Sequence, residues 1–143
     1  MALLNPIDAF IYSMTLSAAI DGEISDKKMN HIYYLIESLP IFQSYENKNA
    51  DTSINTCIEL LRADNSPEDL IALIDKSLNR NSKRIAYTLS VEIMMVDQNF
   101  TNEKLRLLEI FENIFQIHSL ETTAIKHSVK IKYSDLESEI GEI

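Results

Sequence analysis

The sequence predicts an all-α fold, a single-domain bundle of about seven helices that includes two repeated helical hairpins. The chain has two glycines in 143 residues, where average usage would give roughly ten. Few positions can therefore adopt the positive φ that hairpin-rich β folds need. Apolar residues recur at i, i+3 and i+4 along the chain, and no segment alternates with a period of two. The length is that of one domain.

Helices in the first half of the chain are predicted from start signals followed by apolar stripes. Asn5 and Pro6 begin the first helix, which should run to about residue 20. Ser25 caps the second helix, and Pro40 ends it. Residues 43–51 are polar and are expected to form a loop. The third helix is predicted from an apolar stripe made by Ile54, Cys57, Ile58 and Leu61. The fourth is predicted from a start signal, Ser66 followed by Pro67.

Three more helices are predicted in the second half. Asn81 or Ser82 should open the fifth, Thr101 the sixth and Ser119 the last, which runs to about residue 131. From residue 134 onward every charged residue is acidic. We therefore expect residues 1–133 to form the domain and residues 134–143 to be a disordered acidic tail.

Charge and cysteine content exclude several function classes. The net charge of −9 disfavours nucleic-acid binding, which needs Lys and Arg to displace counterions. Cys57 is the only cysteine, so no intramolecular disulfide can form and a reducing compartment fits best. The N-terminus lacks the basic start and apolar run of a signal peptide, and no stretch approaches the ~20 apolar residues of a membrane span. The expected location is the cytoplasm.

An internal repeat stands out from the general helical pattern. Residues 18–29 and 94–105 both read as a helix end, an Asp, two polar or small residues, an apolar residue, a Ser or Thr cap and a second helix. Asp21 and Asp97 end the first helix of each copy, and Gly22 eases the reversal in the first. Two such hairpins are expected to pack as a pseudo-symmetric pair.

Around these turns the sequence resembles the TerB family, a domain associated with tellurite resistance that is also similar to the N-terminal region of DjlA-type J-domain proteins. The matches are the run Asp21-Gly22-Glu23-Ile24-Ser25 and, in the second copy, Asp97, Phe100, Thr101 and Glu103. The likeness also takes in residues 9–12, 39–42, 57–61 and 86–92, and covers about residues 5–133. It implies an all-helical bundle in a bacterial cytosolic system linked to tellurite and stress resistance, with clustered acidic residues for metal ions.

Two lysines depart from the family pattern. Lys28 and Lys104 occupy the third helical position after each turn, where the family usually has Glu. Each lysine removes the reciprocal half of a capping box and one potential carboxylate ligand.

The acidic turns are the candidate cation site. The residues concerned are Asp21, Glu23, Asp97 and Asn99, with Glu103 or Glu92 as a further ligand. Oxygen ligands from short turns suit Ca²⁺ or Mg²⁺, and no other cofactor is predicted. The alternative is structural, because an Asp at a helix exit also serves as an ordinary turn and cap residue.

The remaining titratable candidates favour structural roles. Glu92 lies on an otherwise apolar helix and therefore needs a partner or a raised pKa. A salt bridge or a cap to a neighbouring helix end is favoured there over a catalytic acid. His31, His118 and His127 lack metal-ligand spacing, and Cys57 on an apolar stripe is expected to be buried and inert.

The sequence contains no catalytic motif, so no enzymatic activity is predicted. The first hypothesis is a non-enzymatic TerB-like domain that binds an unidentified partner protein and presents a candidate cation-binding acidic surface. The alternative is a divalent-metal-dependent enzyme or metal sensor that uses the carboxylates of the two Asp turns. A third is a structural adaptor whose turns are only caps.

Overall fold

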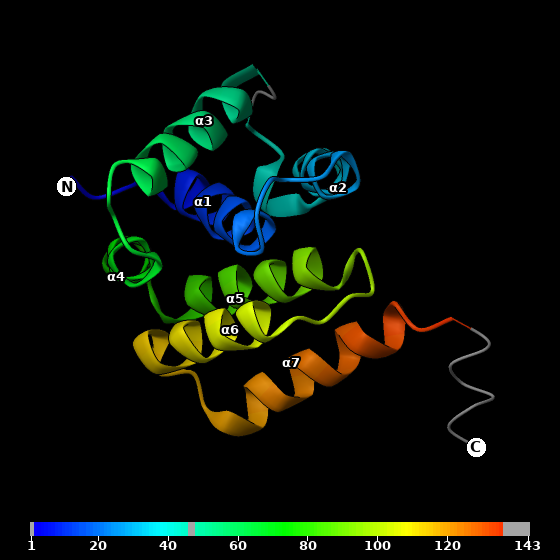
Figure 1. The fold of residues 1–143 in the computed structure, drawn as a ribbon. Helices are drawn as coiled ribbons and strands as arrows, with labels where there is room; N and C mark the ends of the chain where they lie inside the picture. Colours follow the sequence, from blue (N-terminus) through cyan, green and yellow to red (C-terminus); the bar gives the residue numbers. More distant parts are fainter. Residues whose placement is uncertain (1, 46–47, 136–143) are drawn as a thin grey trace.

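Seven α-helices and one short 3₁₀ helix make up the described part of the chain, residues 2–45 and 48–135 of this computed structural model (Figure 1). In chain order they are α1 (Pro6–Ala19), α2 (Asp26–Ser38), η1 (Pro40–Phe42), α3 (Lys48–Arg62), α4 (Pro67–Ser77), α5 (Arg80–Met95), α6 (Asn102–Phe115) and α7 (Ser119–Lys132). The predicted all-α class is confirmed, with no strand in the described residues.

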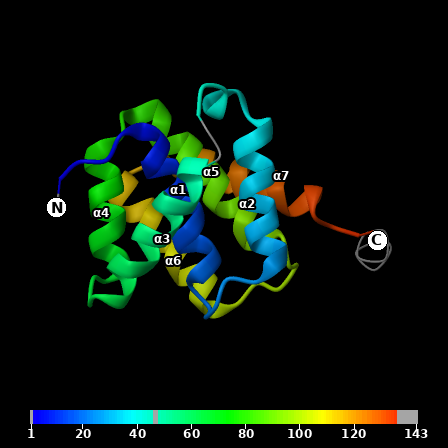
Figure 2. The same ribbon diagram turned by 90° about the horizontal axis from the view of Figure 1, so that it is seen from above.

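Helices α1 and α5 pack against each other at the centre of the molecule. In Figure 1, α1 lies with α2 and α3 in one half and α5 lies with α6 and α7 in the other, while α4 stands at one side. Figure 2 shows that the turn between α1 and α2 lies beside the turn between α5 and α6. The two predicted hairpins therefore bring their Asp turns to the same edge of the fold.

The central position of α1 follows from its composition, because a helix that is apolar on all sides can be buried on all sides. Every residue from Ala9 to Ala18 is buried. Ser13 keeps its hydroxyl satisfied by donating to the carbonyl of Ala9 at 2.9 Å. Across the interface, Ser90 of α5 donates to the Ser13 carbonyl at 3.3 Å. Small serine side chains thus let the two helices approach closely while their hydroxyls bond to backbone carbonyls, whereas the buried hydroxyl of Thr15 in α1 has no hydrogen-bond partner among the described residues.

Most predicted helix starts are confirmed by side-chain caps. The side chains of Asn5, Ser25 and Thr101 accept hydrogen bonds from the backbone N–H three residues later. Ser66 and Asp69 form a complete capping box at the start of α4.

One predicted start is wrong, and the cap of another helix was not predicted. The fifth helix is capped by Asn79, whose side chain accepts from the N–H of Ser82 at 2.9 Å, so Asn81 and Ser82 lie inside the helix. The last helix begins at Ser119 as predicted, but its cap is His118, whose Nδ1 accepts from the N–H of Leu120 at 3.1 Å. In each case the side-chain acceptor lies earlier in the sequence than the residue expected to open the helix. It bonds to an N–H at the helix N-terminus that has no partner within the helix.

The predicted loop over residues 43–51 is also shorter than expected, because α3 already begins at Lys48. Residues 40–42 form the 3₁₀ helix η1, which buries Phe42. Of the predicted tail, Ser134 and Asp135 follow α7, and residues 136–143 lie outside the described residues. None of the helices in the described ranges combines the length and apolar character that a membrane crossing requires.

Candidate functional site

Both Asp turns reverse through a residue with positive φ and close with a backbone hydrogen bond. Gly22 adopts φ +127° in the first turn, and Gln98 adopts φ +58° at the corresponding position of the second. The N–H of each residue donates three residues back, to Ala19 at 3.2 Å and to Met95 at 3.0 Å. Glycine relieves the first reversal as predicted, and the second is made by a glutamine in the left-handed region.

Lys28 of α2 is buried and turns back onto the first Asp turn. Its side chain is 4% exposed. Its Nζ lies 2.9 Å from Oδ1 of Asp21 and donates to the carbonyl of Ala18 at 3.3 Å. The lysine therefore neutralises the turn carboxylate and also satisfies a carbonyl at the C-terminal end of α1.

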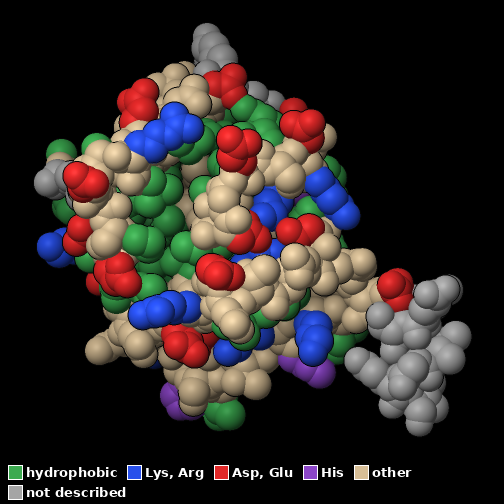
Figure 3. Space-filling model, viewed as in Figure 1, with side chains coloured by type: hydrophobic (Ala, Val, Ile, Leu, Met, Phe, Trp, Pro, Cys, Tyr) green, Lys and Arg blue, Asp and Glu red, His purple; other side chains and the backbone are tan. Residues whose placement is uncertain are grey.

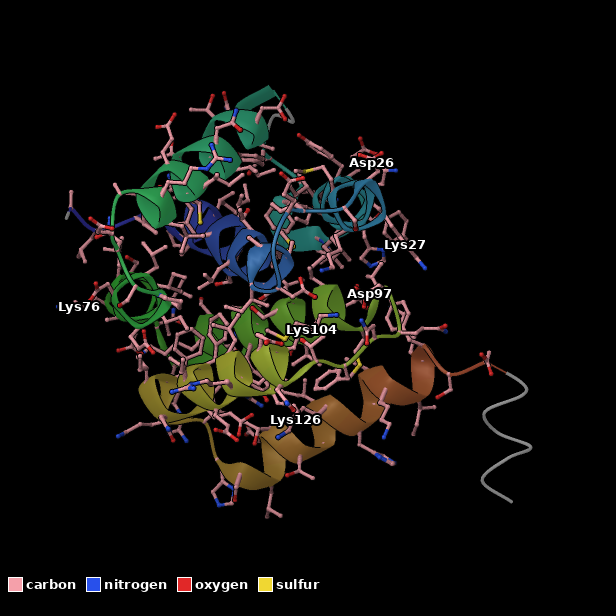
Figure 4. All side chains as sticks on the ribbon, viewed as in Figure 1. Asp26, Lys27, Lys76, Asp97, Lys104 and Lys126 are labelled. Atoms are coloured by element: carbon pink, nitrogen blue, oxygen red, sulfur yellow. The ribbon has the colours of Figure 1, made fainter. Side chains whose placement is uncertain are left out.

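Lys104 of α6 makes the same contacts in the second copy, and its side chain is fully buried at 0% exposure. Its Nζ lies 2.7 Å from Oδ1 of Asp97 and 3.0 Å from the carbonyl of Met94. The carbonyl of Asn99 accepts a third hydrogen bond at 2.5 Å. Figure 4 shows Asp97 and Lys104 close together at the start of α6.

Each lysine also reaches the carboxylate of the other turn. Lys28 Nζ lies 3.6 Å from Oδ2 of Asp97, and Lys104 Nζ lies 3.8 Å from Oδ2 of Asp21. We call these four side chains the Asp–Lys quartet. Burial alone would raise the pKa of Asp97. Hydrogen bonds from Lys104 and from the backbone N–H of Asn99, together with the charges of both lysines, hold this pKa below its usual value. The quartet therefore joins the two hairpins by charge.

The other predicted ligands do not join Asp21 and Asp97. Glu23 and Glu103 are exposed. The Asn99 amide N–H donates to Asp97 Oδ1 at 3.1 Å, which is the turn role that the sequence offered as the alternative. Within residues 2–45 and 48–135, no three His, Cys, Asp or Glu side chains are grouped as metal ligands would be. Because two ammonium nitrogens lie among the converging oxygens, the residues present do not fit a divalent cation.

Glu92 is buried at 9% exposure, and its predicted salt bridge to a neighbouring helix is confirmed. Its two carboxylate oxygens lie 3.1 Å from Nε2 of His31 in α2 and 2.5 Å from Nζ of Lys132 at the end of α7. The hydroxyl of Tyr133 lies 3.0 Å from the same His31 nitrogen. Burial, with contributions from Glu92 and Tyr34, raises the pKa of Tyr133 to about 12. This cluster attaches the end of α7 to α2 and α5.

Cys57 is fully buried, as the sequence predicts. Its Sγ lies 3.8 Å from the carbonyl of Tyr12, and burial raises the pKa of the thiol to about 12. A thiol with so high a pKa is a poor nucleophile near neutral pH.

An apolar groove of about 620 Å³ lies beside the Glu92 cluster, between α2, η1, α5 and α7. Its aliphatic lining consists of Leu35, Leu39, Ile41, Ile85, Leu89 and Ile125. Tyr34 also lines it and is 58% exposed. Arg84 and Lys132 also line it, and each is paired with a carboxylate: Arg84 with Glu121 at 2.9 Å and Lys132 with Glu92 at 2.5 Å. Elsewhere, on the face seen in Figure 3, acidic and basic side chains are interspersed.

Sequence reasoning missed the role of Lys28 and Lys104, which it treated only as lost carboxylates. A signal was present, because both copies carry a lysine seven residues after the turn Asp. It also missed the contribution of Lys132 and Tyr133 to the Glu92 cluster, for which the sequence offers no local signal.

No family model matches this sequence, and no curated protein or solved structure shows significant similarity to it. The TerB resemblance therefore rests on the sequence features described above.

Proposed function

We propose that this chain is a non-enzymatic, TerB-like protein-binding domain of a bacterial cytosolic system associated with tellurite or stress resistance. The resemblance at the two Asp turns supports the proposal that the domain is TerB-like. The groove between α2, α5 and α7 supports the binding role, and it is the observation on which the proposal depends.

The groove favours an amphipathic helix of a partner protein. Aliphatic side chains form its lining, and a helix that lays its apolar face into such a groove is a recurrent mode of protein recognition. Tyr34 offers a large side chain of the type enriched at binding hot spots.

Site-specific photocrosslinking in the native host tests the proposal. A photoreactive benzoylphenylalanine at position 34 should crosslink one protein. The same amino acid at position 3 is the control, because Leu3 is 65% exposed and does not line the groove. The crosslinked protein is then purified and titrated with the unmodified chain and with Tyr34→Asp.

Loss of a hot-spot side chain should weaken this binding by about tenfold or more. Equal crosslinking from positions 3 and 34, or equal affinity of the Tyr34→Asp variant, would contradict the assignment of the groove.

A further inference from the structure

The oxygens of the two Asp turns form a cradle of the kind that hard cations prefer. Both carboxylates of Asp21 and Asp97 point into it, and the carbonyls of Ala18, Met94 and Asn99 line it. Ca²⁺ and Mg²⁺ are bound in proteins by this combination of carboxylate and carbonyl oxygens. The donors alone would therefore suit a cation, as the sequence predicts.

The nitrogens of Lys28 and Lys104 lie within this cradle. Together they carry two positive charges, which equal the charge of one divalent cation and balance the two turn carboxylates. Both side chains are almost completely buried, at 4% and 0% exposure. Burying a charge is costly unless it is paired and hydrogen-bonded, and here every short contact of the two nitrogens is to an oxygen of the cradle.

We propose that the ammonium groups of Lys28 and Lys104 stand in the place of a divalent cation between the two Asp turns, so that this chain joins its hairpins without a metal ion. Each lysine balances its own Asp at short range and the other Asp at 3.6–3.8 Å. One lysine alone would leave a net negative charge in the cradle, and a lysine is accordingly present in both copies. The inference is independent of the proposed protein-binding role.

Thermal unfolding with and without divalent ions tests the inference. Wild type is compared with Lys28→Glu/Lys104→Glu, which converts the cradle to four carboxylates. The matched control is Lys27→Glu/Lys76→Glu, which makes the same change in net charge at two exposed lysines. Figure 4 shows Lys27 pointing outward from α2 and Lys76 on α4, away from the quartet.

The Tm of wild type should be unchanged by millimolar CaCl₂, MgCl₂ or MnCl₂ and by EDTA. The Tm of Lys28→Glu/Lys104→Glu should be low in EDTA and rise by about 5 °C or more with at least one of the ions, because an ion that binds only the folded state stabilises it. The control variant should show no such rise.

Two results would overturn the inference. The first is a saturable calorimetric signal for any of these ions on wild type that Asp97→Asn abolishes. The second is a folded Lys28→Glu/Lys104→Glu variant that responds to ions no more than the control. If the double variant does not fold in either condition, Lys104→Glu alone takes its place. An ion-dependent rise in its Tm supports the inference, and the absence of a rise overturns it.

Discussion

Replacing Lys104 with Met should destabilise the fold more than the same change at Lys28, although the two lysines occupy equivalent positions. Methionine keeps an unbranched side chain and a high helix propensity, so the perturbation is confined to the ammonium group. Removing that group takes away the short ion pair of Asp97 and the hydrogen bonds to the carbonyls of Met94 and Asn99. Asp97 keeps the backbone N–H of Asn99 at 3.1 Å and Lys28 at 3.6 Å.

The loss of stability expected for Lys104→Met follows from the burial of the lysine and from the number of its short contacts. Removing one partner of a buried ion pair costs about 3–5 kcal/mol. The Asp97 side chain is 28% exposed, so water takes over part of the role of Lys104 and the estimate falls to about 2–4 kcal/mol. Lys28 makes one charge-assisted hydrogen bond fewer than Lys104. The loss of stability caused by Lys28→Met should therefore be smaller by about 1–2 kcal/mol.

Urea unfolding followed by circular dichroism measures both losses, provided that the m-values of the variants equal that of wild type. A double-mutant cycle with Asp97→Asn isolates the coupling between Lys104 and Asp97. A Lys104→Met loss below about 1 kcal/mol, or an equal loss at Lys28, would refute the reasoning from burial and contact number.

Three further predictions concern the same turns and the core. Because the pKa of Asp97 is lower in the folded chain than in the unfolded chain, its stabilisation is complete above about pH 4 and is lost as the pH falls through the folded value. The free energy of unfolding, measured by urea titration, should therefore fall less steeply at acid pH for Asp97→Asn than for wild type. An equally steep fall in both proteins would contradict this. Gly22→Ala should cost about 1–2 kcal/mol, because φ +127° is strained for an L-residue even in open space. Gln98→Ala, at φ +58°, should cost less in the same assay, and the reverse order would argue against a backbone origin. Cys57 should resist a thiol reagent at neutral pH until the chain unfolds, and rapid labelling of the folded protein would show that the thiol is accessible.

Helix starts were largely predictable because capping is local. Ser25, Ser66 and Thr101 satisfy N–H groups three residues away, so the sequence contains all the partners involved. The caps at Asn79 and His118 were missed because more than one nearby side chain could serve as the cap, and only the backbone path decides between them.

The candidate site was only partly predictable. The repeat correctly indicated that Asp21 and Asp97 lie together, because two similar hairpins tend to pack with their turns at one edge. Whether a lysine in the first turn of a helix points to solvent or folds back depends on the preceding helix and on the opposite hairpin. That information is tertiary, so the burial of Lys28 and Lys104 could not be read from spacing alone.

The Glu92 cluster shows the same limit. An isolated Glu on an apolar helix face indicates that some partner is needed. The partners come from α2 and from the end of α7, 61 and 40 residues away in sequence. The sequence could therefore predict that Glu92 is paired, and the fold was needed to identify His31 and Lys132.

The contact lengths in the Asp–Lys quartet have a consequence for the order of folding. Each short ion pair, at 2.9 and 2.7 Å, joins residues seven positions apart within one hairpin. The longer contacts, at 3.6 and 3.8 Å, join residues of different hairpins, Lys28 to Asp97 and Lys104 to Asp21, which lie far apart in the sequence. Closing a short loop loses less chain entropy than closing a long one, so we expect each hairpin to form its own ion pair first. Docking of the two preformed hairpins would then be the slow, non-local step of folding.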